Sequence, residues 1–259
     1  IPRANEQMEM VQSTMLTMYY VHTLDCAVKL YNYMGDEEKS MQWARISEEI
    51  KSAVRENSWD EEIGLFTDFP NSQVFSQHTN ILGILSDVVP ENEQKDLLKR
   101  VLSFDGFDEM ASSYFSFFLF KAMQKTDQEE LYLENLDFWY DFLNRGLTTC
   151  GETGFPSHDR SDSHAWSAHP AYYLLNSVAG IKSAEVGFKS VLISPHLGSL
   201  TDLKASMPHP NGKINVSYEV KSGELTAVIE LPIGLKGNLS LDGKLIPLNE
   251  GINTLNLTL

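Results

Sequence analysis

Residues with chemically useful side chains gather in one stretch of the chain, residues 148–170, which lies between apolar segments with helical spacing. These 23 residues include three His, two Asp, one Glu and one Arg, together with two Gly and two Pro. A loop that only reverses the chain needs turn residues, whereas this mixture suits acid–base chemistry or binding of a polar ligand. We therefore predict that residues 148–170 form the functional loop.

Glu152 is the only acid in the run from Thr148 to Gly154, and small residues surround it. A carboxylate on such a loop can lie at the floor of a pit beside a water molecule, which is the position of a general base. A loop glutamate that caps a helix or faces solvent would explain the same residues. The residues alone leave both interpretations open.

His164 and Trp166 stand two positions apart, so they would not share one face of a helix. Trp166 can stack on the apolar face of a sugar, and His164 can donate a hydrogen bond to a hydroxyl group. A core tryptophan and a histidine bonded to a backbone carbonyl are the structural alternatives. Asp159, Arg160 and Asp162 form either a set that binds hydroxyl groups or a local ion pair, and we favour the structural role for Arg160.

Metal binding and nucleophilic catalysis have weaker support. The spacings of His158, His164 and His169 match no helical ligand set, and no pair of cysteines joins them. A thiol nucleophile at Cys150 rests only on nearby histidines, and no phosphate-binding loop or Gly-x-Ser-x-Gly elbow is present. We expect neither a metal nor an organic cofactor.

Composition limits the partners of this chain. A net charge of −16 over 259 residues argues against nucleic acid and against anionic membrane surfaces, and a neutral or cationic ligand fits better. No apolar run approaches the roughly 20 residues of a membrane span. The start at Ile1, with no leader, suggests a processed chain or an excised piece. Cys26 and Cys150 are expected to be free thiols, and the cellular compartment stays open.

Most of the first 180 residues show helical periodicity. The pattern predicts helices over 6–34, 37–56, 73–88, 91–104, 110–124, 127–145 and 170–179, joined by short connections in antiparallel pairs. Residues 59–68 lose this period and predict a loop or small β-hairpin. The acidic trio at 60–62 is better explained as an exposed turn of that hairpin than as a catalytic set.

Near residue 186 the period becomes strand-like. Alternating apolar residues predict strands within 191–193, 214–220, 225–231 and 252–259, with hairpin turns at Ser222-Gly223 and Asp242-Gly243. No fixed repeat recurs between the helical hairpins, so we favour a toroid over a solenoid. The predicted fold class is α+β multidomain: a partial (α/α)6 toroid over 1–184 and a small antiparallel β-sandwich over 185–259. A closed toroid has about twelve helices and we count seven.

Several blocks of sequence resemble the C-terminal part of the bacterial α-L-rhamnosidases of glycoside hydrolase family 78. The blocks at 148–152, 160–170, 187–189 and 208–214 match in order and separation, as do upstream blocks at 59–66, 76–80 and 113–115. This resemblance implies an (α/α)6 toroid followed by a β-sandwich, and an inverting hydrolase that removes terminal α-L-rhamnose from a glycan or glycoside.

The resemblance also implies roles for single residues. Glu152 matches the general base and His164 a histidine that contacts the sugar. The remaining residues expected near the pocket are Gln77, His78, Tyr114, Asp162 and Trp166. Gly151 stands where some members of the family carry a Trp immediately before the base, so one wall of the pocket differs.

The family's general acid lies in an acidic, Arg-containing motif upstream of any residue present here, and we find no such motif in residues 1–259. The chain then carries half of a catalytic pair, and its partner is the missing N-terminal part of the same enzyme. An inverting glycosidase for another sugar and a catalytically inactive carbohydrate-binding fragment are the alternatives.

Overall fold

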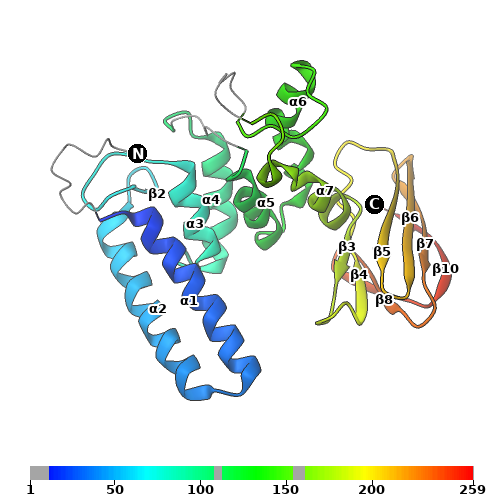
Figure 1. Cartoon of the computed structure of the whole chain (residues 1–259), viewed down its shortest axis with the longest axis horizontal. Coiled ribbons are helices and arrows are strands. Elements are labelled where there is room, and N and C mark those ends of the chain that lie inside the picture. Colours follow the sequence, from blue (N-terminus) through cyan, green and yellow to red (C-terminus); the bar gives the residue numbers. More distant parts are fainter. Residues whose placement is uncertain (1–11, 108–112, 154–160, 259) are drawn as a thin grey trace. The chain divides into compact units, whose positions relative to one another are not determined.

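The computed structural model describes residues 12–107, 113–153 and 161–258. The chain divides into two compact units, Ile1–Asp127 and Gln128–Leu259 (Figure 1). The first unit is mainly helical, and the second combines short helices with two four-stranded sheets. Within the described ranges, none of the helices has the length and apolar character required to cross a membrane.

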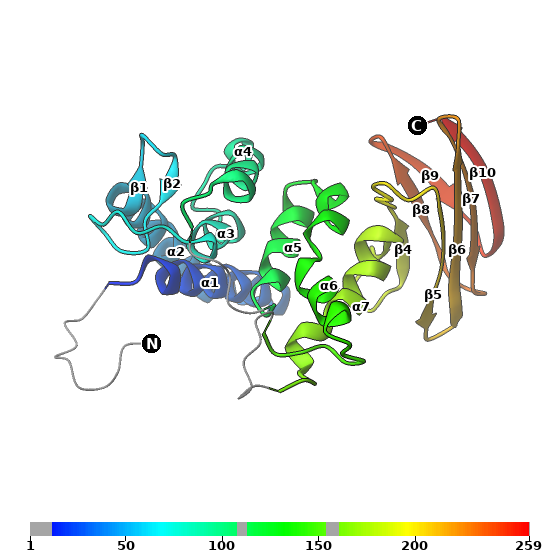
Figure 2. The ribbon, with the colours of Figure 1, turned by 90° about the horizontal axis from the view of Figure 1, so that it is seen from above.

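The first unit begins with a hairpin of two long helices, α1 (Thr14–Met34) and α2 (Glu37–Ser58), which lie side by side in both views (Figures 1 and 2). Residues 6–11 of the predicted helix lie outside the described ranges, and α1 starts at Thr14, where the Ser13 side chain caps it by accepting the Leu16 N–H. The predicted stop is confirmed, because Gly35 adopts a left-handed φ of 78°. Asp36 then caps α2 by accepting the Lys39 N–H.

The predicted β-hairpin after α2 is confirmed. Strands β1 (Trp59–Asp60) and β2 (Leu65–Phe66) pair antiparallel. One Asp60 carboxylate oxygen accepts the backbone N–H groups of Glu62 and Ile63, at 3.0 and 2.9 Å. The acidic trio is therefore a turn, as expected, with Glu61 and Glu62 exposed.

Three further helices complete the first unit: α3 (Gln77–Leu85), α4 (Glu91–Ser103) and α5 (Ser116–Lys125). α3 is shorter than the predicted 73–88, because Phe75 bridges Thr67 in extended conformation and the Ser76 hydroxyl caps the helix at Thr79. Residues 110–112 of the predicted helix over 110–124 lie outside the described ranges, and α5 begins at Ser116. α3 packs against α1, α4 and α5, so it lies at the centre of this unit.

The predicted single helix over 127–145 is wrong. The chain forms two short 3₁₀ helices, η1 (Glu129–Leu131) and η2 (Leu133–Asn135), before α6 (Asp137–Asn144) begins. The Asn135 amide bonds back to the Leu131 carbonyl at 2.9 Å, and Glu129 is held by Lys182 from far along the sequence. Side-chain bonds of this kind compete with a continuous helix.

A second helical stretch follows the functional loop. It comprises η3 (Ala165–Ala168), α7 (Pro170–Tyr173) and a π-helical turn, η4 (Leu174–Val178). As predicted, Pro170 occupies the first turn of α7 and Gly180, with φ of 74°, ends the stretch. The seven α-helices of the described residues form no closed barrel.

The β-sandwich contains two sheets, visible edge-on in Figure 2. One has the order β3 (Ile181–Ser183), β4 (Ser190–Ile193), β8 (Lys236–Leu241) and β9 (Lys244–Leu248). The other has the order β10 (Gly251–Thr258), β7 (Glu224–Leu231), β6 (Gly212–Lys221) and β5 (Asp202–His209). All pairings are antiparallel except β4 with β8, which is parallel.

Both predicted hairpin turns are present, because Ser222-Gly223 and Asp242-Gly243 have positive φ at both positions. The inner faces of the sheets share one core, which includes Ile193, Val216, Ile229 and Leu239. The predicted class, helical hairpins followed by a β-sandwich, is confirmed. The boundary between 184 and 185 remains a prediction, and β3 before it already pairs with β4.

Candidate active site

Two backbone segments close the base of the functional loop. The Glu152 N–H donates to the Ser161 carbonyl at 2.9 Å, and the His164 N–H donates to the Cys150 carbonyl at 2.8 Å. The Thr149 hydroxyl donates to the backbone carbonyl of Asp162, and Asp162 itself is exposed to solvent. These bonds bring Glu152 and His164 together although they are twelve positions apart in the sequence. The predictions for His158, Asp159 and Arg160 concern residues outside the described ranges.

The Glu152 carboxylate is mostly shielded from water, with 13% of its side chain exposed. Its Oε2 atom accepts the Ser161 N–H at 3.2 Å and lies 3.9 Å from His164 Nδ1. A fixed carboxylate beside a limited opening to solvent can orient one water molecule and accept its proton. This geometry suits the predicted general base.

Trp166 lies on η3 with 37% of its surface exposed, so it is not a core tryptophan. Its ring packs on His164, with centroids 3.9 Å apart at 51°. Its Nε1–H donates to the Glu152 carbonyl oxygen at 3.1 Å. Trp166 therefore fixes the backbone of Glu152, a role that the sequence did not indicate, and still presents ring surface to solvent.

Helix α6 supports both arms of the loop. Arg145, at its C-terminal end, donates to the Thr153 carbonyl at 3.2 Å and pairs with Asp141 at 3.0 Å. Trp139 donates from Nε1 to the Ser167 carbonyl at 2.7 Å. Sequence reasoning missed these supports; the spacing of Asp141 and Arg145, four residues apart on a helix, was the one available signal.

Gly151 packs closely against its surroundings. A Cβ atom added there would lie 3.1 Å from the ring of Phe142 and 3.2 Å from Leu147. A larger residue would need these side chains to move. Phe142 and Leu147 therefore leave little room for a side chain at position 151.

The predicted pocket residues Gln77, His78 and Tyr114 belong to the first unit. Gln77 and His78 begin α3, and the His78 ring stacks on Phe115 with centroids 4.0 Å apart. Burial lowers the pKa of His78, although the nearby Asp68 carboxylate opposes this effect. Tyr114 is exposed. Their assignment to one pocket with Glu152 remains a prediction.

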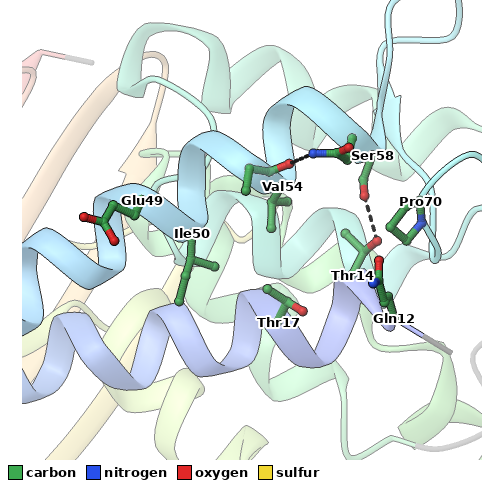
Figure 3. A pocket seen from close by; sticks show the side chains of 10 residues that line it. Gln12, Thr14, Thr17, Glu49, Ile50, Val54, Ser58 and Pro70 are labelled. Atoms are coloured by element: carbon green, nitrogen blue, oxygen red, sulfur yellow. Dashed lines mark hydrogen bonds between the residues drawn. The ribbon is translucent and has the colours of Figure 1, made fainter. Parts of the chain in front are cut away.

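A hollow of about 470 Å³ lies elsewhere, between the N-terminal end of α1 and the C-terminal half of α2 (Figure 3). Thr14 and Ser58 share a hydrogen bond of 2.9 Å at one end of it. Among the described residues that line it, Glu49 alone carries a carboxylate, whereas glycoside hydrolysis normally needs two. This hollow is a poor candidate for the active site.

Comparison with known families identifies the chain. The model of the bacterial α-L-rhamnosidase six-hairpin glycosidase domain matches residues 3–178, and that of the bacterial α-L-rhamnosidase C-terminal domain matches residues 180–247. The chain belongs to the bacterial α-L-rhamnosidase family. The resemblance noted in the sequence is thereby confirmed.

Individual rhamnosidases agree. The chain is 25% identical over 193 residues to an α-L-rhamnosidase of Formosa agariphila, covering 68% of this chain and 20% of that protein. It is 23% identical over 244 residues to one of Alteromonas sp., covering 86% of this chain and 26% of that protein. The chain thus spans about a quarter or less of the length of these relatives.

Solved rhamnosidase structures share the fold. The structure of a family 78 rhamnosidase of Bacillus sp. GL1 matches with a TM-score of 0.78 and 27% identity, covering 89% of this chain and 26% of that one. An α-L-rhamnosidase of Aspergillus terreus matches with a TM-score of 0.78 and 15% identity, covering 93% and 30%. In both comparisons the matched region is most of this chain but less than a third of the solved rhamnosidase.

Proposed function

We propose that this chain is the C-terminal part of an inverting α-L-rhamnosidase and that Glu152 is its general base. One observation carries this proposal: the shielded Glu152 carboxylate, 3.9 Å from His164 Nδ1, within the segment matched by the glycosidase-domain model. Paired backbone segments hold both residues in place. Such support keeps a base in position for catalysis.

In the proposed reaction, ionised Glu152 accepts a proton from a water molecule as its oxygen attacks the anomeric carbon. The glycosidic C–O bond breaks, and a general acid on the other side protonates the departing oxygen, which inverts the configuration. His164 and the exposed part of the Trp166 ring would contact the sugar. The acid would come from residues upstream of this chain.

Terminal α-L-rhamnosides are the proposed substrates. The relatives are named α-L-rhamnosidases, and one structural neighbour, from Streptomyces avermitilis, is described as complexed with L-rhamnose. A panel of p-nitrophenyl glycosides tests this class, because a clear preference for another sugar would exclude rhamnoside specificity. Calorimetry with rhamnose tests whether the chain alone binds the sugar without turnover.

The central test is Glu152→Gln in the longer enzyme that contains this chain, with p-nitrophenyl α-L-rhamnoside as substrate. Loss of the base should lower kcat by about 10²–10⁴-fold. Glu185→Gln, at an exposed position between β3 and β4, is the matched control and should keep full activity. A kcat within a few-fold of wild type would exclude Glu152 as the base.

Two further measurements complete this test. NMR of the first product formed should show the inverted anomer of rhamnose, and retention would exclude the inverting mechanism. The isolated chain, folded and monodisperse, should show no turnover. Turnover that Glu152→Gln abolishes would instead place a general acid within residues 1–259.

A further inference from the structure

The β-sandwich has four edge strands, β5 and β10 in one sheet and β3 and β9 in the other. An edge strand presents unpaired backbone N–H and C=O groups to any passing chain, and proteins protect such edges with charged side chains, proline or short length. Three of the four edges have this protection. β3 has only three residues, β5 contains Asp202, Lys204 and Pro208, and β9 contains Lys244 and Pro247.

Strand β10 lacks all of these protections. Its eight residues include no charged side chain and no proline, and they pair one to one with β7 along the whole strand. Among the described residues, no backbone hydrogen bond joins β10 to any element except β7. β10, drawn in red in Figure 2, therefore presents a long, regular and uncharged edge to solvent.

The apolar core reaches this edge. Leu255 and Leu257 pack on the core of the sandwich and remain partly exposed, whereas Leu225, Ala227 and Ile229 on the neighbouring β7 are fully buried. A further strand beside β10 would cover these two leucines. Burial of their remaining apolar surface would favour the addition of such a strand.

The sequence of β10 is suited to pairing with a copy of itself. Residues 254–258 are Thr-Leu-Asn-Leu-Thr, which reads the same in both directions. In an antiparallel pair with a two-fold axis at Asn256, Thr254 lies opposite Thr258 of the second copy, and Leu255 lies opposite Leu257 of the second copy. Such Thr–Thr and apolar pairs stabilise neighbouring strands, and because β10 has no charge, no like charges meet.

We propose that β10 is an interaction surface for a second copy of this chain, in which two β10 strands pair antiparallel about Asn256. The two four-stranded sheets would then form one sheet of eight strands. Since alternate residues of a strand share one face, the leucines of both copies would lie on the core side. The C-terminal-domain model ends its match at residue 247, before β10 begins, so the family comparison assigns no role to this strand.

The charge of the chain also favours this contact. A net charge of −16 makes two copies repel each other, so a close approach is most favourable through a contact that has no charged residue. A strand from elsewhere in the longer polypeptide is the competing partner of β10. The inference does not depend on the role of Glu152.

The test measures the molar mass of the longer enzyme that contains this chain, by sedimentation equilibrium over a range of concentrations. We expect a dimer that dissociates on dilution. Asn256→Lys changes an exposed side chain and places two ammonium groups opposite each other at the axis, so it should raise the dimer Kd at least fivefold. Ser206→Lys adds the same charge at an exposed position of β5 in the same sheet and should leave Kd unchanged.

A charge exchange tests the position of the axis. Asn256→Glu alone should also weaken the dimer, whereas an equimolar mixture of Asn256→Lys and Asn256→Glu should regain the wild-type dimer, because opposite charges then face each other. A variant that is merely destabilised would not be rescued by the second one. Circular dichroism of each variant checks that the fold is retained.

Three results would overturn the inference. The longer enzyme could be monomeric at every concentration, which would assign the edge of β10 to another strand of the same polypeptide or leave it unpaired. Ser206→Lys could weaken the dimer as much as Asn256→Lys, or the mixture of charged variants could remain monomeric. A monomeric enzyme that loses its activity after Glu152→Gln would refute this inference and uphold the proposed base.

Discussion

A buried ion cluster links the helical segment and the β-sandwich of the second unit. Glu129 lies on η1 and only 4% of its side chain is exposed. The Lys182 ammonium group, on β3, donates hydrogen bonds to Glu129 Oε1 at 2.9 Å and Oε2 at 2.7 Å. His196 Nε2 lies 3.2 Å from Glu129 Oε2. Burial alone would raise the pKa of Glu129. Hydrogen bonds from His196 and Lys182, with the charge of Lys182, outweigh burial and lower that pKa to about 2.

The proposed substitution is Lys182→Met, which keeps an unbranched side chain, one atom shorter, and removes its charge. Lowering the pKa of Glu129 from 4.5 to about 2 corresponds to about 3 kcal/mol of stabilisation of its ionised form, because each pKa unit corresponds to about 1.36 kcal/mol. His196 remains in the variant and supplies part of this stabilisation. We therefore expect the free energy of unfolding at pH 7 to fall by about 2 kcal/mol.

The pH dependence follows from the direction of the shift. Because the folded-state pKa of Glu129 is below its ordinary value, its contribution is complete above pH 4.5 and is lost as the pH falls towards 2. The difference in stability between wild type and Lys182→Met should thus be largest near neutral pH and shrink in acid.

Urea unfolding followed by circular dichroism measures this difference, and amide hydrogen exchange in β3 localises it. Lys236→Met, at an exposed position of β8 in the same sheet, is the control and should change stability by less than about 0.5 kcal/mol. A Lys182→Met variant as stable as wild type at pH 7, or a difference that grows in acid, would refute the reasoning.

Two further substitutions test the supports of the site and of the first unit. Trp166→Phe keeps an aromatic ring but removes the 3.1 Å hydrogen bond to the Glu152 carbonyl oxygen. Such a bond contributes about 1 kcal/mol, so we expect kcat of the longer enzyme to fall by up to about tenfold with little change in KM. A raised KM with unchanged kcat would contradict this positioning role. The fully buried Asn80 side chain accepts the Phe66 N–H at 2.7 Å and donates to the Phe66 carbonyl at 3.0 Å. Asn80→Ala leaves both groups without this partner, so the free energy of unfolding should fall by about 2–4 kcal/mol. The exposed Asn57→Ala is its control in urea unfolding, and equal effects of the two changes would exclude the buried network as the cause.

Local signals in the sequence predicted much of the fold. The stop of α1 at Gly35, the turn at Asp60 and both sandwich hairpins depend on a few adjacent residues whose backbone preferences are intrinsic. The motif around Glu152 and His164 could likewise be recognised in the sequence, because its blocks keep their order and spacing along the chain.

Other features depended on residues distant in sequence. The segment 127–145 has helical periodicity, yet Glu129 bonds Lys182, 53 residues away, and the helix is broken. The parallel pairing of β4 with β8 joins strands more than 40 residues apart, and the close approach of Gly237 to Val191 has no signal in either strand alone.

The site shows the same division. Residue types and spacing indicated Glu152, His164 and Trp166, but the bond from Trp166 to the Glu152 backbone and the support from Arg145 required the folded chain. Local preference acts over a few residues and can be read in order along the sequence. Long-range contacts also depend on which distant partners folding brings within hydrogen-bonding distance, so only the tertiary structure decided them.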